Sequence, residues 1–310
     1  MNNLTYIERN LTRMTSSGAA ANTQTFNLPR EHLYNRLFLR AYLGATTTNV
    51  YTANAEDLVV SNIEVIANGQ LVVKSFSWAD LVNINKYVNG VADVDRIALA
   101  ADKTEGMTSC IVDFSLTRKD LSTMLPSFKF TTLDLKLSFA AQTAYGGDVG
   151  VMPYVDVMSR ELLYVKEFQD IKFAINKEVT KTISPAATGE KQIDLDIGNV
   201  YRRIYVYGQG GATATTAQND TMTSLSVVQD GVIFHKKLNF LENQAKDKQE
   251  YHLETKVTGV TMLGFDMEGS NLASVDSAPF SSWRVLVTIP SVSNAVSVRI
   301  IPQELIYPRG

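Results

Sequence analysis

The sequence has few of the residues that build disulfides, metal centres and membrane spans. Its 310 residues include 1 cysteine, Cys110, which cannot form an internal disulfide, and 3 histidines, none placed at the spacing of a zinc motif. No segment reaches the roughly 20 consecutive apolar residues that cross a bilayer. The first 25 residues lack the apolar core of a secretory signal. We therefore expect a soluble chain that holds no metal and no cofactor.

Signatures of nucleic-acid binding and of catalysis are also missing. The chain has 29 Lys and Arg against 32 Asp and Glu, whereas binding to nucleic acid depends on clustered cations. It has no Gly-x-Ser-x-Gly motif, and its glycine-rich segment 207–215 lacks the Gly-Lys-Ser/Thr ending of a phosphate loop. The acid pairs Asp93 with Asp95 and Asp194 with Asp196 are interpreted as solvated strand acids. We predict that the chain is not an enzyme and does not recognise a nucleic-acid sequence.

What the sequence does contain is an internal repeat. Residues 17–48 align without a gap on residues 184–215, and 10 of the 32 positions are identical, including Tyr34 with Tyr201. A second block follows at a slightly smaller offset, so that residues 63–76 match residues 225–238. Weaker matches, based on pattern alone, pair 108–117 with 281–290 and 133–139 with 296–302. A repeat of roughly 150 residues has the size of a domain and not of a solenoid unit.

The repeat predicts two domains, residues 1–150 and residues 168–310. The segment between them, residues 151–167, is predicted to be a linker because Gly and Pro cluster around its start. Residues 157–168 fit either a linker helix or an entering strand, and the sequence does not decide between these alternatives.

Each copy has the pattern of an antiparallel sandwich. Apolar and polar residues alternate over residues 133–139, as in a half-buried strand. Asn68-Gly69 and Asp230-Gly231 each lie between strand-like runs, which predicts a type I′ hairpin in both copies. A short helix is expected after each hairpin, over 78–88 and 241–254, and the second is so polar that we expect it to be largely exposed. The predicted class is all-β, with jelly-roll or Greek-key connections.

One face of the matched strands is rich in Tyr and Arg, which are enriched where protein surfaces meet. Two explanations stay open: cross-strand packing inside each domain, or an interface with another element or subunit. The candidate interface residues are Tyr34, Arg36, Phe38, Arg40, Tyr201, Arg203, Tyr205 and Tyr207.

The duplicated "YNRLFLR" and "YRRIYVY" strands, together with the two hairpins, carry a resemblance to a known family. A chain of this length with such a repeat resembles the double jelly-roll major capsid proteins of tailless icosahedral viruses. These include membrane-containing bacteriophages and the adenovirus hexon lineage. The resemblance implies two tandem eight-stranded antiparallel jelly-roll sandwiches with a few short helices. It also implies homotrimers that act as pseudo-hexagonal tiles of a shell.

The same resemblance implies where the chain would be found and what it would touch. It implies a location in the virion after folding in the host cytoplasm, with neighbouring capsomers and other capsid proteins as partners. Residues 1–16 either reach an internal lipid membrane or form a first strand. The alternative function is carbohydrate binding, as a lectin or a virus fibre module, because tandem β-sandwiches also serve that purpose.

Overall fold

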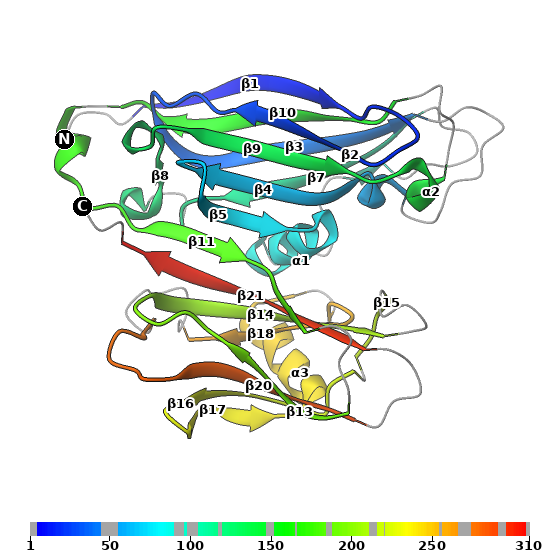
Figure 1. The fold of residues 1–310 in the computed structure, drawn as a ribbon, viewed down its shortest axis with the longest axis vertical. Coiled ribbons are helices and arrows are strands. Elements are labelled where there is room, and N and C mark those ends of the chain that lie inside the picture. Colours follow the sequence, from blue (N-terminus) through cyan, green and yellow to red (C-terminus); the bar gives the residue numbers. More distant parts are fainter. Residues whose placement is uncertain are drawn as a thin grey trace. The chain divides into compact units, whose positions relative to one another are not determined.

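Two compact units make up the computed structural model (Figure 1). Unit 1 comprises Met1–Lys86, Asp93–Asn176 and Tyr307–Gly310, and unit 2 comprises Tyr87–Ala92 and Lys177–Ile306. No helix among the residues that the structure describes is long and apolar enough to cross a membrane. The described residues are 5–44, 55–89, 96–97, 105–116, 120–146, 152–164, 166–183, 188–210, 216–219, 221–253, 256–265, 274–290 and 296–307.

Unit 1 is built from two antiparallel sheets. The first has the order β1-β10-β3-β7-β6, with β8 paired to β3, and the second has the order β5-β4-β9-β2. The strands of the first sheet are β1 (Tyr6–Thr15), β10 (Tyr154–Leu162), β3 (Leu33–Gly44), β7 (Glu105–Asp113), β6 (Arg96–Ile97) and β8 (Leu125–Pro126). Those of the second are β5 (Leu71–Phe76), β4 (Val60–Ala67), β9 (Leu133–Phe139) and β2 (Asn22–Asn27). The helices are α1 (Trp78–Asn89), α2 (Gln142–Tyr145) and four 3-10 turns, Ala55–Leu58, Leu121–Thr123, Ser127–Lys129 and Lys166–Asp170.

Unit 2 repeats this arrangement. In its first sheet β21 lies between β14 and the strand formed by β11 and β12, while β15, β18 and β19 pair with β14. Its second sheet has the order β13-β20-β16-β17. The first sheet consists of β11 (Ile175–Val179), β12 (Lys181–Ile183), β21 (Ser297–Ile306), β14 (Val200–Gly210), β15 (Thr216–Ala217), β18 (Val260–Gly264) and β19 (Val275–Asp276). The second consists of β13 (Gly189–Asp194), β20 (Trp283–Ile289), β16 (Ser224–Gln229) and β17 (Val232–Leu238), and α3 (Phe240–Glu250) follows β17.

The strand order of both units is that of a jelly roll. When the eight main strands of each unit are numbered along the chain, one sheet runs first, eighth, third, sixth and the other runs second, seventh, fourth, fifth. This order confirms the predicted fold of two tandem jelly rolls. It also corrects the two weakest repeat matches, which paired β7 with β20 and β9 with β21. By position in the sheets, β20 is equivalent to β9, and β21 is equivalent to β10. Each weak match had therefore been shifted by one strand.

The predicted linker over residues 151–167 is corrected by the position of β10. Residues 154–162 form this strand, which pairs with β1 on one side and with β3 on the other. It is the eighth strand of unit 1 and is central to its sheet. The chain enters the main part of unit 2, Lys177–Ile306, only after this strand, at Asn176–Lys177.

The two predicted hairpins are present and are held in the same way. Asn68 and Asp230, the first turn residues, have φ angles of 52° and 49°, and the following glycines also have positive φ, as type I′ turns require. The Asn68 side chain accepts a hydrogen bond from the Thr131 amide at 2.7 Å. The Asp230 side chain accepts one from the Ser281 amide at 2.9 Å. Thr131 and Ser281 each precede the seventh strand by two residues, so both hairpins are fixed to equivalent places.

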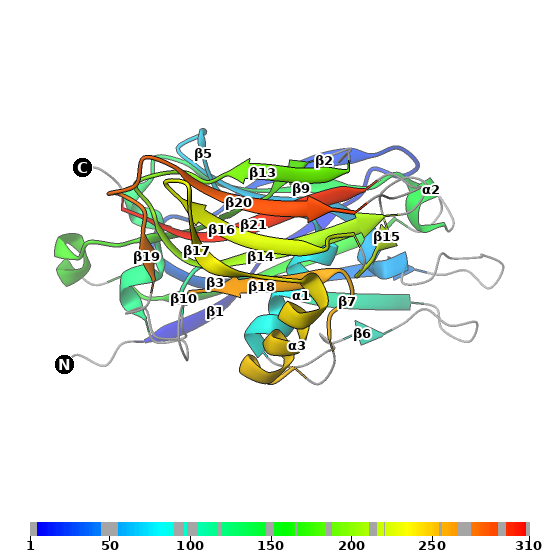
Figure 2. The same ribbon diagram turned by 90° about the horizontal axis from the view of Figure 1, so that it is seen from below.

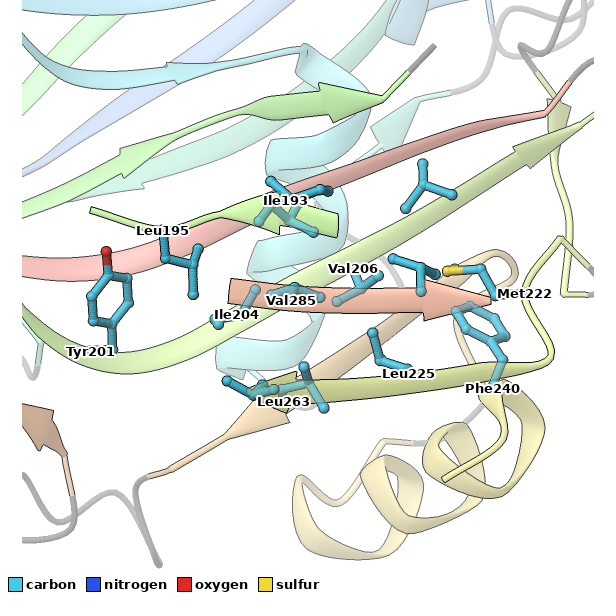
Figure 3. Close-up of a cluster of buried hydrophobic side chains, with 14 of the residues drawn as sticks. Ile193, Leu195, Tyr201, Ile204, Val206, Met222, Leu225, Phe240, Leu263 and Val285 are labelled. Atoms are coloured by element: carbon cyan, nitrogen blue, oxygen red, sulfur yellow. The ribbon is translucent and has the colours of Figure 1, made fainter. Parts of the chain in front are cut away.

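The inner faces of the two sheets of unit 2 form its core (Figure 3). Alternate residues of β20 are buried along its whole length, which is the period of two expected from the sequence. β9 in unit 1 has the same alternation. Figure 3 shows side chains from β13, β14, β16, β18 and β20 converging, with Phe240 at the start of α3. The labelled members are Ile193, Leu195, Tyr201, Ile204, Val206, Met222, Leu225, Phe240, Leu263 and Val285.

In each unit a helix side chain caps the sixth strand of the first sheet, at a position where no further described strand pairs with it. In α1, Asn85 donates a hydrogen bond to the Ile111 carbonyl at 2.8 Å and accepts one from the Ile111 amide at 2.7 Å. In α3, Asn243 donates to the Met262 carbonyl at 3.1 Å, and Asp247 accepts from the Met262 amide at 2.8 Å. Figure 2 shows α3 alongside β18, the strand that contains Met262. Both caps satisfy backbone groups that a terminal strand would otherwise leave open.

This role corrects the prediction that the polar segment 241–254 is largely exposed. Phe240, Asn243, Gln244 and Asp247 of α3 are buried. The buried face of this helix is polar because it binds a strand edge, whose amides and carbonyls require hydrogen-bonding partners.

Candidate assembly surface

The structure divides the eight predicted interface residues into a buried group and an accessible group. All eight lie on β3 or β14, the third strand of each unit. Phe38 is half-buried and Arg40 is exposed. The six that are buried within the chain are Tyr34, Arg36, Tyr201, Arg203, Tyr205 and Tyr207. Of the eight, Phe38 and Arg40 are therefore the residues that are accessible from outside the chain.

Tyr34 and Tyr201 occupy equivalent places near the start of their strands. Each hydroxyl donates a hydrogen bond to a backbone carbonyl five residues earlier, at 2.9 Å to Pro29 and 2.6 Å to Asp196. Burial raises the pKa of both phenols far above the usual value, so both stay neutral. The bonds tie the preceding turn to the strand, and the two tyrosines stabilise the fold and do not form an interface.

A buried carboxylate pairs in register with each of these tyrosines. Glu161 lies opposite the first and Glu304 opposite the second, in both cases beside a β-bulge. Arg9 donates two hydrogen bonds to Glu161, at 2.6 and 3.2 Å, and Lys177 lies 3.5 Å from Glu304. Burial raises the pKa of Glu304, and the neighbouring lysine opposes this shift. Since a buried charge is costly without a partner, each unit supplies its acid with a cation from the first strand.

The remaining candidates on β14 are covered by side chains of unit 2. Tyr205 packs edge-on against Tyr87, with the ring centroids 5.8 Å apart. The Arg203 guanidinium lies 5.2 Å from the ring centroid of Tyr251, and the guanidinium of an arginine on β21 lies 5.6 Å from that of Tyr207. These side chains are therefore packed inside the domain, which is the first of the two explanations that the sequence left open. They present no surface to a second subunit.

The equivalent face of unit 1 is accessible. Side chains of β1, β10, β3 and β7 project from the side of the sheet opposite its core, as the alternation along a strand requires. We name this surface the Arg–Tyr face. It consists of the accessible residues Arg13, Phe38, Arg40, Tyr42, Tyr154, Asp156 and Arg160, together with Arg36, which is buried beside Phe38.

One half of the Arg–Tyr face is built around Phe38. The guanidinium of Arg36 lies 5.8 Å from the centroid of this ring, and that of Arg160 lies 5.6 Å from it. Arg36 also pairs with Asp113 at 2.8 Å, and Arg160 donates a hydrogen bond to Glu8 at 2.8 Å. Each arginine is thus held between an aromatic ring and a carboxylate.

The other half is built around Tyr154. Arg13 donates two hydrogen bonds to Asp156, at 2.7 and 2.9 Å, and its guanidinium lies 3.9 Å from the Tyr154 centroid. The rings of Tyr154 and Tyr42 stack, with centroids 4.7 Å apart and an interplanar angle of 19°. The Tyr154 hydroxyl donates to Glu105 at 3.2 Å. Mutual packing therefore holds the side chains of this half in place as well.

Such a face is suited to binding a protein. Tyr and Arg are enriched at interfaces, and side chains already held by their neighbours lose little freedom when a partner binds. In the part of the chain that the structure describes, no three His, Cys, Asp or Glu residues are close enough to hold a metal ion. Cys110 is buried, and burial raises the pKa of its thiol, which disfavours the nucleophilic thiolate.

The acid pair Asp194 and Asp196 has a structural explanation. Asp194 is exposed on β13, while Asp196 forms ion pairs with Lys177 at 3.0 Å and Lys181 at 2.9 Å. Burial raises the pKa of Asp196, but the hydrogen bonds from the two lysines outweigh this and lower it overall. The other pair, Asp93 with Asp95, and residues 211–215 of the glycine-rich segment lie outside the described residues.

Three of the eight residues of the Arg–Tyr face, Tyr154, Asp156 and Arg160, lie in the segment that the sequence analysis predicts to be a linker, so they are not among its candidates. The sequence contains a signal for this strand at its start, where apolar residues alternate with Tyr154 and Asp156, and the structure shows the matching alternation in burial. Val155 and Val157 supply the apolar positions of that alternation.

Comparison with known proteins identifies the fold. The sequence matches no protein-family model and no curated protein. Its structure is similar to that of the STIV MCP, from Sulfolobus Turreted Icosahedral Virus, with a TM-score of 0.76 and 14% identity over 98% of this chain and 97% of that one. It is also similar to the major capsid protein of bacteriophage PM2, with a TM-score of 0.65 and 15% identity over 99% of both chains. A third similar structure is that of the PBCV-1 virus capsid, with a TM-score of 0.63 and 12% identity over 99% of this chain and 97% of that one. The chain therefore has the fold of these capsid proteins over nearly its whole length.

Proposed function

We propose that the chain is a major capsid protein whose homotrimers form pseudo-hexagonal tiles of an icosahedral shell. The observation that carries this proposal is the presence of two jelly rolls with the same strand order in one polypeptide. The full-length similarity to viral capsid proteins supports it. The role is structural and needs neither a catalytic centre nor a cofactor.

The physical advantage of the duplication is one of symmetry. Three copies of a chain with two similar units present six similar blocks, which approximate a sixfold tile although the true symmetry is threefold. Hexagonal tiles pack without gaps into a shell. The Arg–Tyr face provides one contact surface, and its partners are a second copy, a neighbouring capsomer or another capsid protein. In this proposal the chain folds in the host cytoplasm and resides in the virion.

The N-terminal segment acts mainly as a strand. Tyr6–Thr15 form β1, which pairs with β10 over almost its entire length. This favours the first-strand alternative over a segment that reaches an internal lipid membrane, and a membrane contact is not part of the proposal.

The mass of the purified chain in solution tests the proposal. Light scattering coupled to size-exclusion chromatography should give about three times the chain mass of 34.2 kDa, unchanged over a hundredfold dilution, because obligate interfaces bury on the order of 2,000 Å² or more. A monomer at every concentration would contradict it. A monomer that also bound one class of glycan specifically would favour the carbohydrate-binding alternative.

A further inference from the structure

Terminal strands of a sheet invite pairing with other chains unless they are protected. In this protein β18, and β7 beyond its two-residue pairing with β6, are capped by Asn85, Asn243 and Asp247, as described above. β2 and β13 carry mainly polar or charged residues, in the sequences NTQTFN and GEKQID. Four terminal strands are thus protected by one of the two usual means.

β17 is a terminal strand of a different kind. It ends the sheet β13-β20-β16-β17, and among the described residues no further strand pairs with it. Val232 is 69% exposed and Ile233 is 54% exposed, while Leu241, soon after the strand, is 54% exposed. At the equivalent hairpin of unit 1, Gln70 is exposed and Leu71 is half-buried. The apolar surface is therefore specific to the second copy of the hairpin.

The hairpin turn that precedes Val232 and Ile233 is held in place by hydrogen bonds. Asp230, which precedes them, accepts hydrogen bonds from the amides of Ser281 and Ser282 at 2.9 and 2.7 Å. The hydrogen bond from the Ser281 hydroxyl contributes most to lowering the pKa of Asp230, and the other hydrogen bonds add to this effect. The carboxylate therefore stays charged at neutral pH and keeps these hydrogen bonds. An ordered apolar edge costs less conformational entropy to bind than a mobile loop would.

A second terminal strand has matching properties. Among the described strands, exposed large hydrophobic side chains occur on β17 and on β1, where Tyr6 is 40% exposed. β1 ends the sheet of unit 1 that carries the Arg–Tyr face. Its 10 residues are long enough to lie along the whole of β17, which has 7.

We propose that β17 of one copy docks edge to edge against β1 of a second copy, so that Tyr6 lies beside the apolar end of β17 that carries Val232 and Ile233. This inference rests on the proposed trimer and identifies the strands that would form its seam. The two edges are different surfaces, so the contact is heterologous, and three such contacts close a ring. The partner of β17 is therefore another copy of this chain, because in a ring of three copies each β17 meets the β1 of the next copy.

Charge substitutions on the exposed edge test the seam. The double variant Val232→Lys, Ile233→Lys should keep the melting behaviour of a folded chain, because both side chains are exposed. It should weaken trimer association by on the order of tenfold or more, as expected for substitutions at the centre of an interface. Light scattering over a dilution series measures this effect. Gln70→Lys, at the equivalent hairpin of unit 1, is the matched control and should leave the mass unchanged.

Three outcomes are distinguishable. Loss of the trimer in the double variant alone supports the seam. A double variant that remains as trimeric as the wild type overturns the seam and leaves the proposed function standing. A wild-type chain that is monomeric throughout overturns the proposed function and the seam together.

A disulfide trap gives an independent test that does not depend on dissociation. The variant Tyr6→Cys, Val232→Cys should form covalent dimers and trimers on mild oxidation, seen by denaturing electrophoresis without reductant. Cys110 is buried and should not compete. The control Tyr6→Cys, Gln70→Cys should stay monomeric on the gel. Absence of species larger than a monomer from the first variant would overturn the seam.

Discussion

The third strands of the two units, β3 and β14, share their frame and differ in their outer faces. At the start of both strands a buried tyrosine, Tyr34 or Tyr201, ties down the preceding turn. Further along, Phe38 and Arg40 of β3 are accessible, whereas the residues aligned with them include Tyr205, which is fully buried. The comparison teaches that the two copies share the interactions that hold the sheet together and differ in the residues that decide what covers it.

The shared frame extends beyond the tyrosines. Hairpin clamps, edge caps and buried acids recur at equivalent positions, although many of the residues differ. Asn68 is replaced by Asp230 in the clamp, and Asn85 is replaced by Asn243 with Asp247 in the cap. The interaction is kept at each place while the side chain that makes it varies. The following predictions test whether the two copies are physically equivalent, from the largest expected effect to the smallest.

The tyrosine pair should give the largest effect. Tyr34→Ala and Tyr201→Ala each remove a fully buried ring and its hydrogen bond, and each should lower the free energy of unfolding by about 3–5 kcal/mol. Urea unfolding followed by fluorescence measures both losses. Tyr307→Ala removes a ring that is 59% exposed and serves as the control. A loss in only one of the two buried variants would show that the copies are not equivalent.

The edge cap of unit 2 should make its stability depend on pH. Burial raises the pKa of Asp247 to about 6 from 3.8, so the folded chain holds this proton more tightly than the unfolded chain. The resulting stabilisation is complete below the unfolded pKa and is lost as the pH rises through about 6. Relative to Asp247→Asn, the wild type should lose about 2 kcal/mol of stability between about pH 4 and pH 7. Parallel pH profiles of the two proteins would contradict this.

Removing the cap in either unit should lower the stability of the chain by a similar amount. Asn85→Ala leaves both backbone groups of Ile111 without their partner, and Asn243→Ala does the same for the Met262 carbonyl. Each should cost about 1–3 kcal/mol. In hydrogen exchange, the Ile111 amide should lose its protection in the first variant. Asn83→Ala, on the same helix as Asn85, is the control, and equal protection in both variants would argue against the cap.

The outer faces should respond differently to the same substitution. Arg40→Ala changes an exposed side chain and should alter the stability of the chain by less than about 0.5 kcal/mol. Arg203→Ala removes a buried guanidinium that packs on Tyr251 and should cost about 1 kcal/mol or more. Thermal unfolding of both variants measures the difference. Similar losses would mean that the two faces are buried to a similar extent.

The sequence predicted the parts of the fold that depend on local patterns. The hairpins at Asn68-Gly69 and Asp230-Gly231 follow from the residues that tolerate positive φ, and the third strands follow from their identity across the repeat. The equivalence of the last strands was missed because a pattern of alternating apolar residues is the same for any half-buried strand. The strand order of the sheets and the clamps at Thr131 and Ser281, which are features of the tertiary structure, show which strands correspond.

The candidate surface was predicted in part. The abundance of Tyr and Arg on β3 and β14 was visible in the sequence. Whether these side chains are buried depends on which other elements pack over the sheet, and the sequence of a strand does not show this. Tyr205 is covered by Tyr87, which lies more than 100 residues away in sequence. The polar face of α3 was misjudged for a related reason, because Asn243 and Asp247 are buried against a strand edge that polarity alone does not reveal.

Electron microscopy of the purified oligomer tests the central claim most directly. If duplicated jelly rolls serve to build a tile, class averages should show six densities of similar size in a near-hexagonal ring, with only threefold symmetry when the two kinds of unit are resolved. Particles with two densities, or rings of another order, would contradict the account.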